Sequence, residues 1–197
     1  MKRSSLILIA IVVIVAIVGY STFKGAYNTM VTKTQNVESQ WAGVETQYQR
    51  RMDLYGSVVS TIKGSATFEQ ETLTKVIEAR SKATSVQVDP SKLTPESLEQ
   101  FQQAQGEMSS AFSKLMVVVE RYPELQTTRA FQDFQAQIEG TENRINKARD
   151  DFNNTVQDYN TYIKQFPTNL IAGMFGFAEK GYFKAAAGSD QAPNIEF

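Results

Sequence analysis

The chain has neither cysteine nor histidine among its 197 residues. Without cysteine no disulfide can form, so the fold must rest on its own apolar core. The same two absences exclude thiol catalysis, thiolate metal sites and acid–base chemistry by imidazole. Proline and glycine are also scarce, with five and 11 residues, which is few for an all-β or disordered chain.

The chain also lacks an excess of positive or negative charge. The net charge is −1, from 20 basic and 21 acidic residues, and basic residues adjoin only at Lys2-Arg3 and Arg50-Arg51. This balance predicts no nucleic-acid surface. The carboxylate pairs Glu69/Glu71 and Asp150/Asp151 would diverge on a helix, and no phosphate-loop or zinc-protease motif occurs. We therefore predict a non-enzymatic protein with no catalytic residue, metal ligand or cofactor site.

The N-terminus carries one long hydrophobic run. Leu6 to Val18 contains no polar residue, and the uncharged stretch from Ser4 to Phe23 is 20 residues long. A helix of that length spans about 30 Å, the thickness of a bilayer's hydrocarbon core. We predict that residues 1–24 form a transmembrane anchor, with Leu6 to Phe23 in the lipid.

A cleaved signal peptide is the alternative, because it too has a basic start and an apolar run. However, neither Val18-Gly19-Tyr20 nor Lys24-Gly25-Ala26 provides small residues at both required positions. The run is also long enough to be retained as an anchor. The positive charges of Lys2-Arg3 lean toward a cytoplasmic N-terminus, which would place the rest of the chain outside the cytoplasm.

Beyond the anchor the pattern becomes amphipathic. Apolar residues alternate at spacings of three and four, which predicts a helix with one buried stripe that continues from the bilayer to about Ser65. The stripe has two polar positions, Thr34 and Arg51. Its members are Phe23, Tyr27, Met30, Thr34, Val37, Trp41, Val44, Tyr48, Arg51, Tyr55, Val58 and Ile62.

Three further helices are predicted from similar stripes. The second runs from about Phe68 to Ser85, and Val86 to Lys92 is a loop; the third starts at Thr94-Pro95 and ends at Pro123. Thr127 or Thr128 caps the fourth, which Pro167 ends. The inward residues of the second helix are Leu73, Val76, Ile77, Ala79, Arg80 and Ala83. Those of the third are Leu98, Phe101, Gln105, Met108, Phe112, Leu115, Val119 and Tyr122. Those of the fourth are Phe131, Phe134, Ile138, Thr141, Ile145, Ala148, Phe152, Val156, Tyr159, Ile163 and Phe166.

Four amphipathic helices joined by short loops predict an all-α fold, an antiparallel four-helix bundle over residues 25–187 with a tail at 188–197. The fourth helix should return toward the membrane. The apolar segment that follows is too short to span it, so we expect it either to enter the lipid interface or to pack on the first helix near Tyr27 and Met30. Its apolar members are Leu170, Ile171, Met174, Phe175 and Phe177.

Polar residues on or beside the stripes are the candidate interior or partner positions. Arg51 could await an anionic ligand, but we favour a guanidinium that snorkels or pairs with Glu78 on the second helix. The triplet Glu142-Asn143-Arg144 could bind a partner; we favour a role in fixing helix register. A pocket inside the bundle would lie around Arg51, Gln105 and Thr141.

Twelve short motifs together resemble those of the LemA family, over nearly the whole chain. They are Tyr27-Asn28, Asn36 to Ala42, Arg50 to Leu54, Ile62 to Gly64, Glu71 to Leu73, Glu78 to Arg80, Tyr122 to Leu125, Thr141 to Ile145, Phe152-Asn153, Tyr159-Asn160, Phe166 to Ala172 and Phe175 to Phe177. One departure is Tyr55 to Val58, where the family often has Ile-Pro-Asn-Leu, so a proline kink expected there is missing.

The resemblance implies a bacterial protein anchored in the inner membrane and built on a four-helix bundle; members include a protein tied to magnetosome formation. It supplies no catalytic residue. Two hypotheses follow. The first is a scaffold that contacts other membrane or envelope proteins, or itself, without catalysis. The second is a ligand or signal sensor with a pocket inside the bundle.

Overall fold

A computed structural model describes residues 3–63, 69–126 and 128–184. Within these ranges the regular elements are all helical and no strand occurs, which confirms the all-α prediction. The elements are α1 (Arg3–Lys63), α2 (Gln70–Ser85), the 3₁₀ turn η1 (Pro90–Lys92), α3 (Pro95–Val119), α4 (Pro123–Gln126), α5 (Arg129–Lys164) and α6 (Thr168–Phe175). The predicted boundaries at Ser65, Phe68 and Thr127, and the tail at 188–197, lie outside the described residues.

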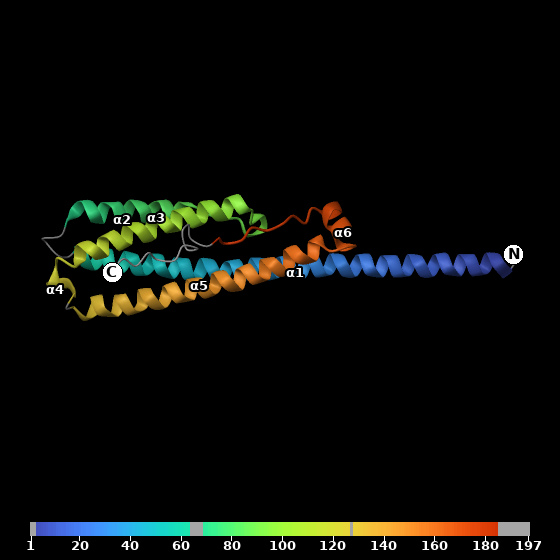
Figure 1. The fold of residues 1–197 in the computed structure, drawn as a ribbon, viewed down its shortest axis with the longest axis horizontal. Helices are drawn as coiled ribbons and strands as arrows, with labels where there is room; N and C mark the ends of the chain where they lie inside the picture. The colour runs from blue at the N-terminus through green and yellow to red at the C-terminus, as the bar shows by residue number, and fades with distance from the viewer. Residues whose placement is uncertain (1–2, 64–68, 127, 185–197) are drawn as a thin grey trace, which may run out of the picture.

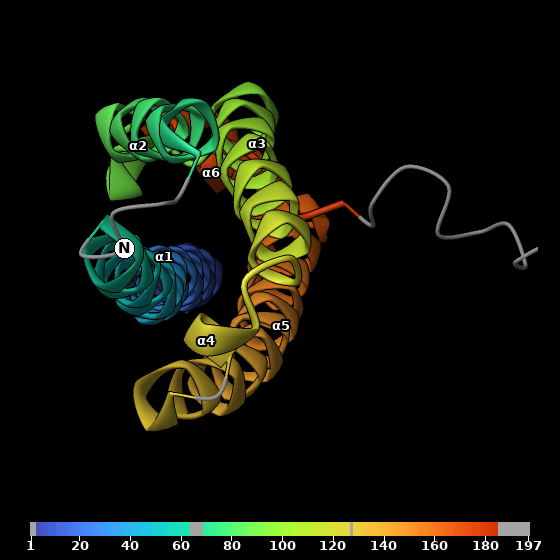
Figure 2. The same ribbon diagram turned by 90° about the vertical axis from the view of Figure 1, so that its left-hand side faces the viewer.

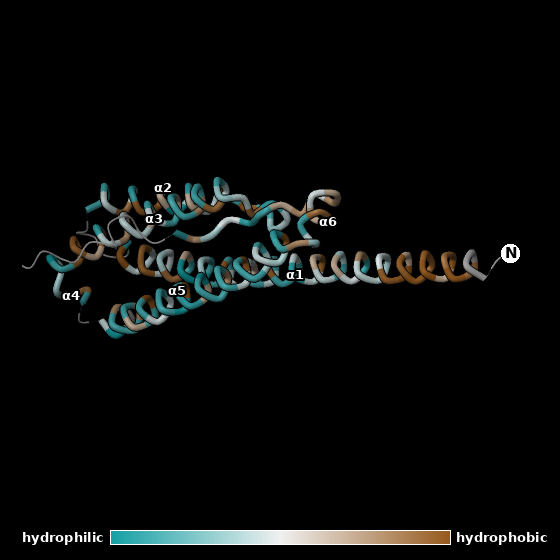
Figure 3. The backbone as a smooth tube through the Cα atoms, turned by 45° about the vertical axis from the view of Figure 1, so that its right-hand side comes forward, coloured by the Kyte–Doolittle hydropathy of each residue, from teal (hydrophilic) through white to brown (hydrophobic). Residues whose placement is uncertain are grey.

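Helix α1 is a single helix of 61 residues whose N-terminal part projects beyond all the other elements (Figure 1). The large apolar side chains from Leu6 to Val18 are exposed, and no other part of the described chain covers them. This projecting end is the most hydrophobic stretch of the backbone (Figure 3). By length and composition it is sufficient to cross a membrane.

From Met30 onward, the same helix buries one side. The predicted stripe is confirmed at nearly every position, including Trp41 and Ile62, which have no exposed surface. Arg51 is buried among the apolar members. The helix runs through Gly56 without interruption, as expected for a segment that lacks the kink-forming proline.

The long helices pack mainly as two pairs, α1 with α5 and α2 with α3. In the end view, α2 and α3 lie on one side and α1 and α5 on the other (Figure 2). The ion pairs Lys33–Asp158 and Arg51–Glu142 show that α1 and α5 are antiparallel. The pairs are joined by aromatic rings, since Tyr55 of α1 stacks on Phe112 of α3 at 3.7 Å between centroids. The regular four-helix bundle stays a prediction.

Helix starts follow the predicted caps. The Thr94 hydroxyl accepts a hydrogen bond from the Ser97 N–H, and the Ser97 hydroxyl accepts from the Thr94 N–H, so the two form a capping box before Pro95. Thr128 caps α5 through the N–H of Phe131. The predicted end of the third helix at Pro123 is wrong, because α3 ends at Val119 and Pro123 instead opens the short α4; proline suits a first helical turn.

Four predicted inward positions are wrong. Phe166 is 80% exposed, Ile77 41% and Tyr27 36%, and Arg80 of α2 is exposed as well. Helix α5 ends at Lys164 and the chain turns toward α6, so Phe166 leaves the α5 stripe before its side chain could be buried. Ile77 is adjacent in sequence to buried Val76, and consecutive helical residues point about 100° apart, so α3 covers only one of them.

After α6 a non-helical segment, residues 177–184, runs back along the domain (red in Figure 1). We call it the strap. Two α5 amides each bind its backbone twice: Asn153 both donates to and accepts from Phe183, and Asn160 does the same with Lys180. Gln102 of α3 binds Lys184 in the same way. These side-chain amides thus form hydrogen bonds with backbone N–H and C=O groups that would otherwise need a neighbouring strand as partner.

At Gly181 the strap lies directly against the start of α3. A Cβ there would lie 2.8 Å from both N and Cα of Pro95, which are backbone atoms that cannot step aside. We expect Gly181→Ala to lower the free energy of unfolding by about 1–3 kcal/mol, as overpacking does. The measurement is denaturant unfolding of the full chain in detergent.

Gly106→Ala is the matched control, because its Cβ would meet open space on the exposed side of α3. That change should raise stability by about 0.5–1 kcal/mol through helix propensity. Equal effects of the two substitutions would contradict the close approach at Gly181.

Candidate functional site

The apolar segment after α5 folds as α6 and packs on α1 where the exposed run ends. The ring of Phe175 lies 5.6 Å from that of Phe23 and 5.0 Å from that of Tyr27, between centroids. Phe177 adds a third edge contact, 5.8 Å from Tyr27. Beyond α6, α1 is the only described element that continues toward the N-terminus (Figure 1). The segment therefore marks the level at which α1 leaves the domain.

Helix α6 has two faces of different exposure. Ile171 and Ala172 are buried against the domain. Leu170 and Met174 are 60% and 73% exposed, so the outer face is apolar as well. The Thr168 hydroxyl donates to the carbonyl oxygens of Tyr162 and Gln165, which ties the start of α6 to the end of α5.

A polar cluster lies in the interior between α1, α3 and α5. The buried guanidinium of Arg51 donates from Nη1 to Oε1 of Glu142 at 3.2 Å and from Nη2 to Oε1 of Gln105 at 2.8 Å. It also lies over the Tyr48 ring, 4.8 Å from its centroid. Burial raises the pKa of Tyr48 and that of Tyr55, whose hydroxyl donates to Glu142.

The predicted pair between Arg51 and Glu78 is wrong. Arg51 points to α3 and α5, while Glu78 is exposed on α2. The side of α1 toward α2 instead brings Arg80 to 4.0 Å from Asp53. Periodicity located the stripe correctly, but it does not say which neighbouring helix faces a given residue.

The other predicted polar positions separate. Thr141 is buried, and its hydroxyl donates to the carbonyl oxygen of Gln137 in its own helix. Asn143 and Arg144 are exposed, so Glu142 is the member of the triplet that reaches Arg51. The structure therefore brings Arg51, Gln105 and Glu142 together, and leaves the remaining candidates outside the cluster.

An open groove of about 640 Å³ adjoins this cluster. Its charged groups are mixed and already paired: Arg149 donates to the Lys184 carbonyl oxygen and lies over the Phe183 ring, and Lys184 lies near Glu99. The lining residues are Tyr48, Arg51, Glu99, Gln102, Gln103, Gln105, Gly106, Ser109, Glu142, Arg149 and Lys184.

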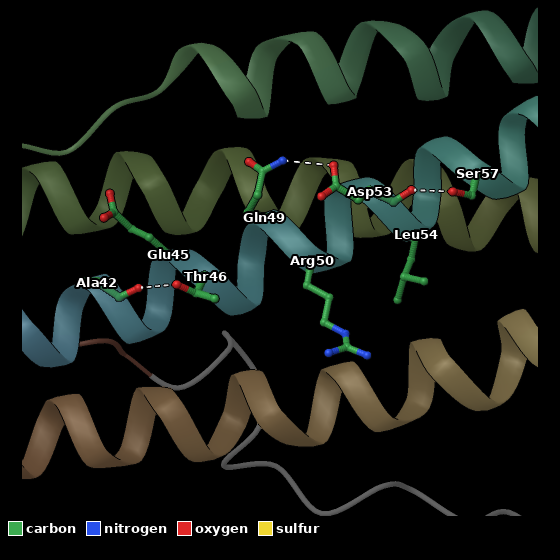
Figure 4. Close-up of a pocket in the computed structure, with 8 residues that line it drawn as sticks. All are labelled: Ala42, Glu45, Thr46, Gln49, Arg50, Asp53, Leu54 and Ser57. Carbon is green, nitrogen blue, oxygen red and sulfur yellow. Dashed lines mark hydrogen bonds between the residues drawn. The ribbon is translucent and has the colours of Figure 1, made fainter.

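A second hollow of about 740 Å³ follows the outer face of α1 (Figure 4). All its lining residues belong to α1 and recur at spacings of three and four, so they form one helix face. We call it the open face of α1. Six of its eight residues are polar or charged, and Gln49 donates to Asp53 across one turn at 3.0 Å. The members are Ala42, Glu45, Thr46, Gln49, Arg50, Asp53, Leu54 and Ser57.

The strap is the feature that sequence reasoning missed. Its Phe183 is buried in an aromatic group with Trp41, Phe101 and Phe152, at 5.5 to 6.5 Å between centroids. A signal was present, because Asn153 and Asn160 lie seven residues apart, each directly after an aromatic core position of α5. Two amides on one helix face point to a bound backbone, but not to which segment supplies it.

The sequence pattern of the LemA family matches residues 40–197. The chain belongs to the LemA family. The match includes the Arg51 cluster, α6 and the strap, and it begins after the exposed apolar run.

Three relatives extend the LemA-family likeness toward the N-terminus. Magnetosome protein MamQ 2 of Paramagnetospirillum magneticum (strain ATCC 700264 / AMB-1) is 26% identical, over 94% of this chain and 74% of its own length. Magnetosome protein MamQ of Magnetospirillum gryphiswaldense (strain DSM 6361 / JCM 21280 / NBRC 15271 / MSR-1) is 24% identical over 93% and 74%. Protein LemA of Metamycoplasma hominis (strain ATCC 23114 / DSM 25592 / NBRC 14850 / NCTC 10111 / PG21) is 24% identical over 85% and 73%.

Removing Arg51 should be costly, because it leaves Gln105 and Glu142 without their common donor. We expect Arg51→Ala to lower the free energy of unfolding by about 3 kcal/mol, the lower end for breaking a buried pair, since Glu142 is partly exposed. Arg50→Ala, at the exposed neighbouring position, should change it by less than about 0.5 kcal/mol. Denaturant unfolding of both variants checks this, and similar losses would contradict a special role for Arg51.

The raised pKa values of Tyr48 and Tyr55 predict a loss of stability in alkali. Both hydroxyls lose their protons at higher pH in the folded state than in the unfolded state. Their contribution is therefore complete below the unfolded pKa of about 10 and falls as the pH rises above it. The double variant Tyr48→Phe/Tyr55→Phe should flatten this decline in the free energy of unfolding. Tyr182→Phe, at an exposed ring, is the control, and an unchanged slope in the double variant would disprove the assignment.

Proposed function

We propose that this protein is a single-pass protein of the bacterial inner membrane whose helical domain, outside the cytoplasm, is a non-enzymatic interaction or scaffold component of the envelope. The observation that carries the proposal is the continuity of α1. One helix is apolar and exposed on all sides at its start, and then buries a stripe that includes Met30, Trp41 and Ile62.

The exposed part of α1 supports the anchor. Apolar surface of this extent is rare on monomeric soluble proteins and is typical of contact with lipid or protein. The 20 uncharged residues from Ser4 to Phe23 match the thickness of a hydrocarbon core, about 30 Å. Lys24 follows directly, where a charge would meet the polar interface.

The rest of α1 supports a scaffold. Because no break separates the span from the domain, the domain cannot swing on a loop and projects from the membrane at a defined height. The open face of α1 carries charges of both signs on Glu45, Arg50 and Asp53, and Asp53 lies 4.0 Å from Arg80 at the edge toward α2 (Figure 4). Such a face offers polar contacts to a neighbouring helix or domain.

The groove beside Arg51 favours a second candidate, a sensor of a small ligand. It has the size of a ligand site and three basic side chains on its walls, Arg51, Arg149 and Lys184. However, each of these is already bonded within the protein, so a ligand would have to displace existing partners. A saturable rise in unfolding temperature with a small anion, lost in Arg149→Ala, would favour the sensor over the scaffold.

Site-specific photo-crosslinking in cells tests the scaffold. A photoreactive residue at Gln49, on the open face, should give one discrete protein adduct that mass spectrometry identifies, either an envelope protein or a second copy. A photoreactive residue at Ser57, on the same face, should give the same adduct. Trp41 on the buried face of the same helix is the control position and should give none. The scaffold is rejected if every exposed position yields only monomer.

The proposed orientation has its own test. The chain lacks cysteine, so Ser113→Cys, at an exposed position of α3, introduces the single thiol. In intact cells a membrane-impermeant maleimide should label it without permeabilisation. Labelling only after permeabilisation would place the domain in the cytoplasm.

A further inference from the structure

We propose that α6 is an interfacial membrane helix, so that the protein touches the bilayer at two places: through α1, which crosses it, and through the outer face of α6, which enters its headgroup boundary. The occupant of this apolar face is lipid of the leaflet that α1 leaves on its way to the domain. The inference rests on the proposed membrane anchor, and it concerns a surface that the anchor alone does not require.

The position of α6 along α1 supports contact with lipid. Phe23 is the last residue of the uncharged run, and the Phe175 ring lies 5.6 Å from it. Contact at that distance puts the C-terminal end of α6 at the level where α1 passes from hydrocarbon to headgroups. The Tyr27 ring, one turn further along α1, contacts the same phenylalanine. Aromatic side chains are enriched at this depth of a membrane.

The absence of charge around α6 also suits a membrane interface. The chain carries no charged residue between Lys164 and Glu179, a loop that contains all of α6. These two flanking residues pair with each other, at 2.7 Å between Nζ and Oε2, on the exposed side of the domain. The segment between Lys164 and Glu179 is therefore uncharged, and an ion pair joins its two ends. The two charged side chains lie on the domain side of the membrane boundary.

Helix α6 has one buried face and one exposed apolar face. Ile171 and Ala172 are buried against α1 and α5, which fixes the orientation of α6. The same orientation exposes Leu170 and Met174, and Phe166 just before the helix is the most exposed of the three. In water these side chains would form an apolar surface that no other part of the described chain covers. Eight residues cannot span a bilayer, so the fitting environment is the interface.

This second contact links the lipid to the aromatic core. Phe177 continues from α6 into the strap, and the strap carries Phe183 to the ring of Trp41. Because Asn160 and Asn153 fix the strap along α5, the position of α6 and that of the core are set together. A domain held at two points cannot tilt freely on the α1 span.

The test uses the full chain in phosphatidylcholine–phosphatidylglycerol vesicles. Single cysteines at Met174, Val13 and Ser113 are labelled with an environment-sensitive nitrobenzoxadiazole dye; no native cysteine interferes. All three side chains are exposed, so labelling does not disturb the core. Emission is then quenched by lipids carrying a doxyl group either at a shallow acyl position or near the chain end. Circular dichroism confirms that each variant is folded.

The expected result is a blue-shifted signal at Met174→Cys that the shallow doxyl quenches more than the deep one. Val13→Cys should show the reverse order, and Ser113→Cys should be quenched by neither. Quenching at Val13 with an unquenched, water-like signal at Met174 overturns the interfacial helix and leaves the anchor standing. An unquenched but blue-shifted signal at Met174 also overturns it, because the face is then covered by a second copy. No quenching at Val13 overturns the anchor, and the inference with it.

Discussion

One unbroken helix with two different patterns of exposure is the constraint on which the structure depends. The first part of α1 has apolar side chains on all sides, and the part from Met30 buries only one side. A helix satisfies its backbone hydrogen bonds internally in either setting, so no loop is needed at the change. Only the side chains therefore differ between the two parts of the helix. The aromatic contacts of Phe23 and Tyr27 with Phe175 lie at the boundary between these parts.

The strap solves a second problem, the closure of the core between the two helix pairs. Helices α1 and α3 meet through large rings, and the space among Trp41, Phe101 and Phe152 is filled by Phe183 from the strap. A non-helical segment brings unpaired N–H and C=O groups with it, and leaving them buried without partners would cost about 1–3 kcal/mol each. Asn153, Asn160 and Gln102 meet this need, which explains amide side chains beside an apolar stripe.

The helices could be predicted from sequence because burial on a helix leaves a period. The stripe of α1, the cap at Thr94 and the α3 core all followed from spacing and cap chemistry. Contacts between elements could not be predicted in the same way. Spacing placed Arg51 on the stripe, but its partner is Glu142 rather than Glu78, since a period indicates a helix face and not the helix that packs against it. The strap has no period, so the role of Phe183 was not predicted from sequence. Phe166 fell in register with the α5 stripe and was placed inward for that reason alone.

The Arg51 cluster influences the position of α6 by fixing the register of α5 against α1. Arg51–Glu142 and Lys33–Asp158 both join α1 to α5, and together they allow one alignment of the antiparallel pair. Sliding α5 by a single turn would move α6 by about 5.4 Å along α1, which would separate Phe175 from Phe23 and Tyr27. It would also leave the buried guanidinium of Arg51 without Glu142, a cost that apolar stripes alone would not impose. An apolar stripe repeats and tolerates such a slip, whereas a buried ion pair does not. The polar cluster in the domain interior therefore sets the height of α6, next to the end of the apolar run.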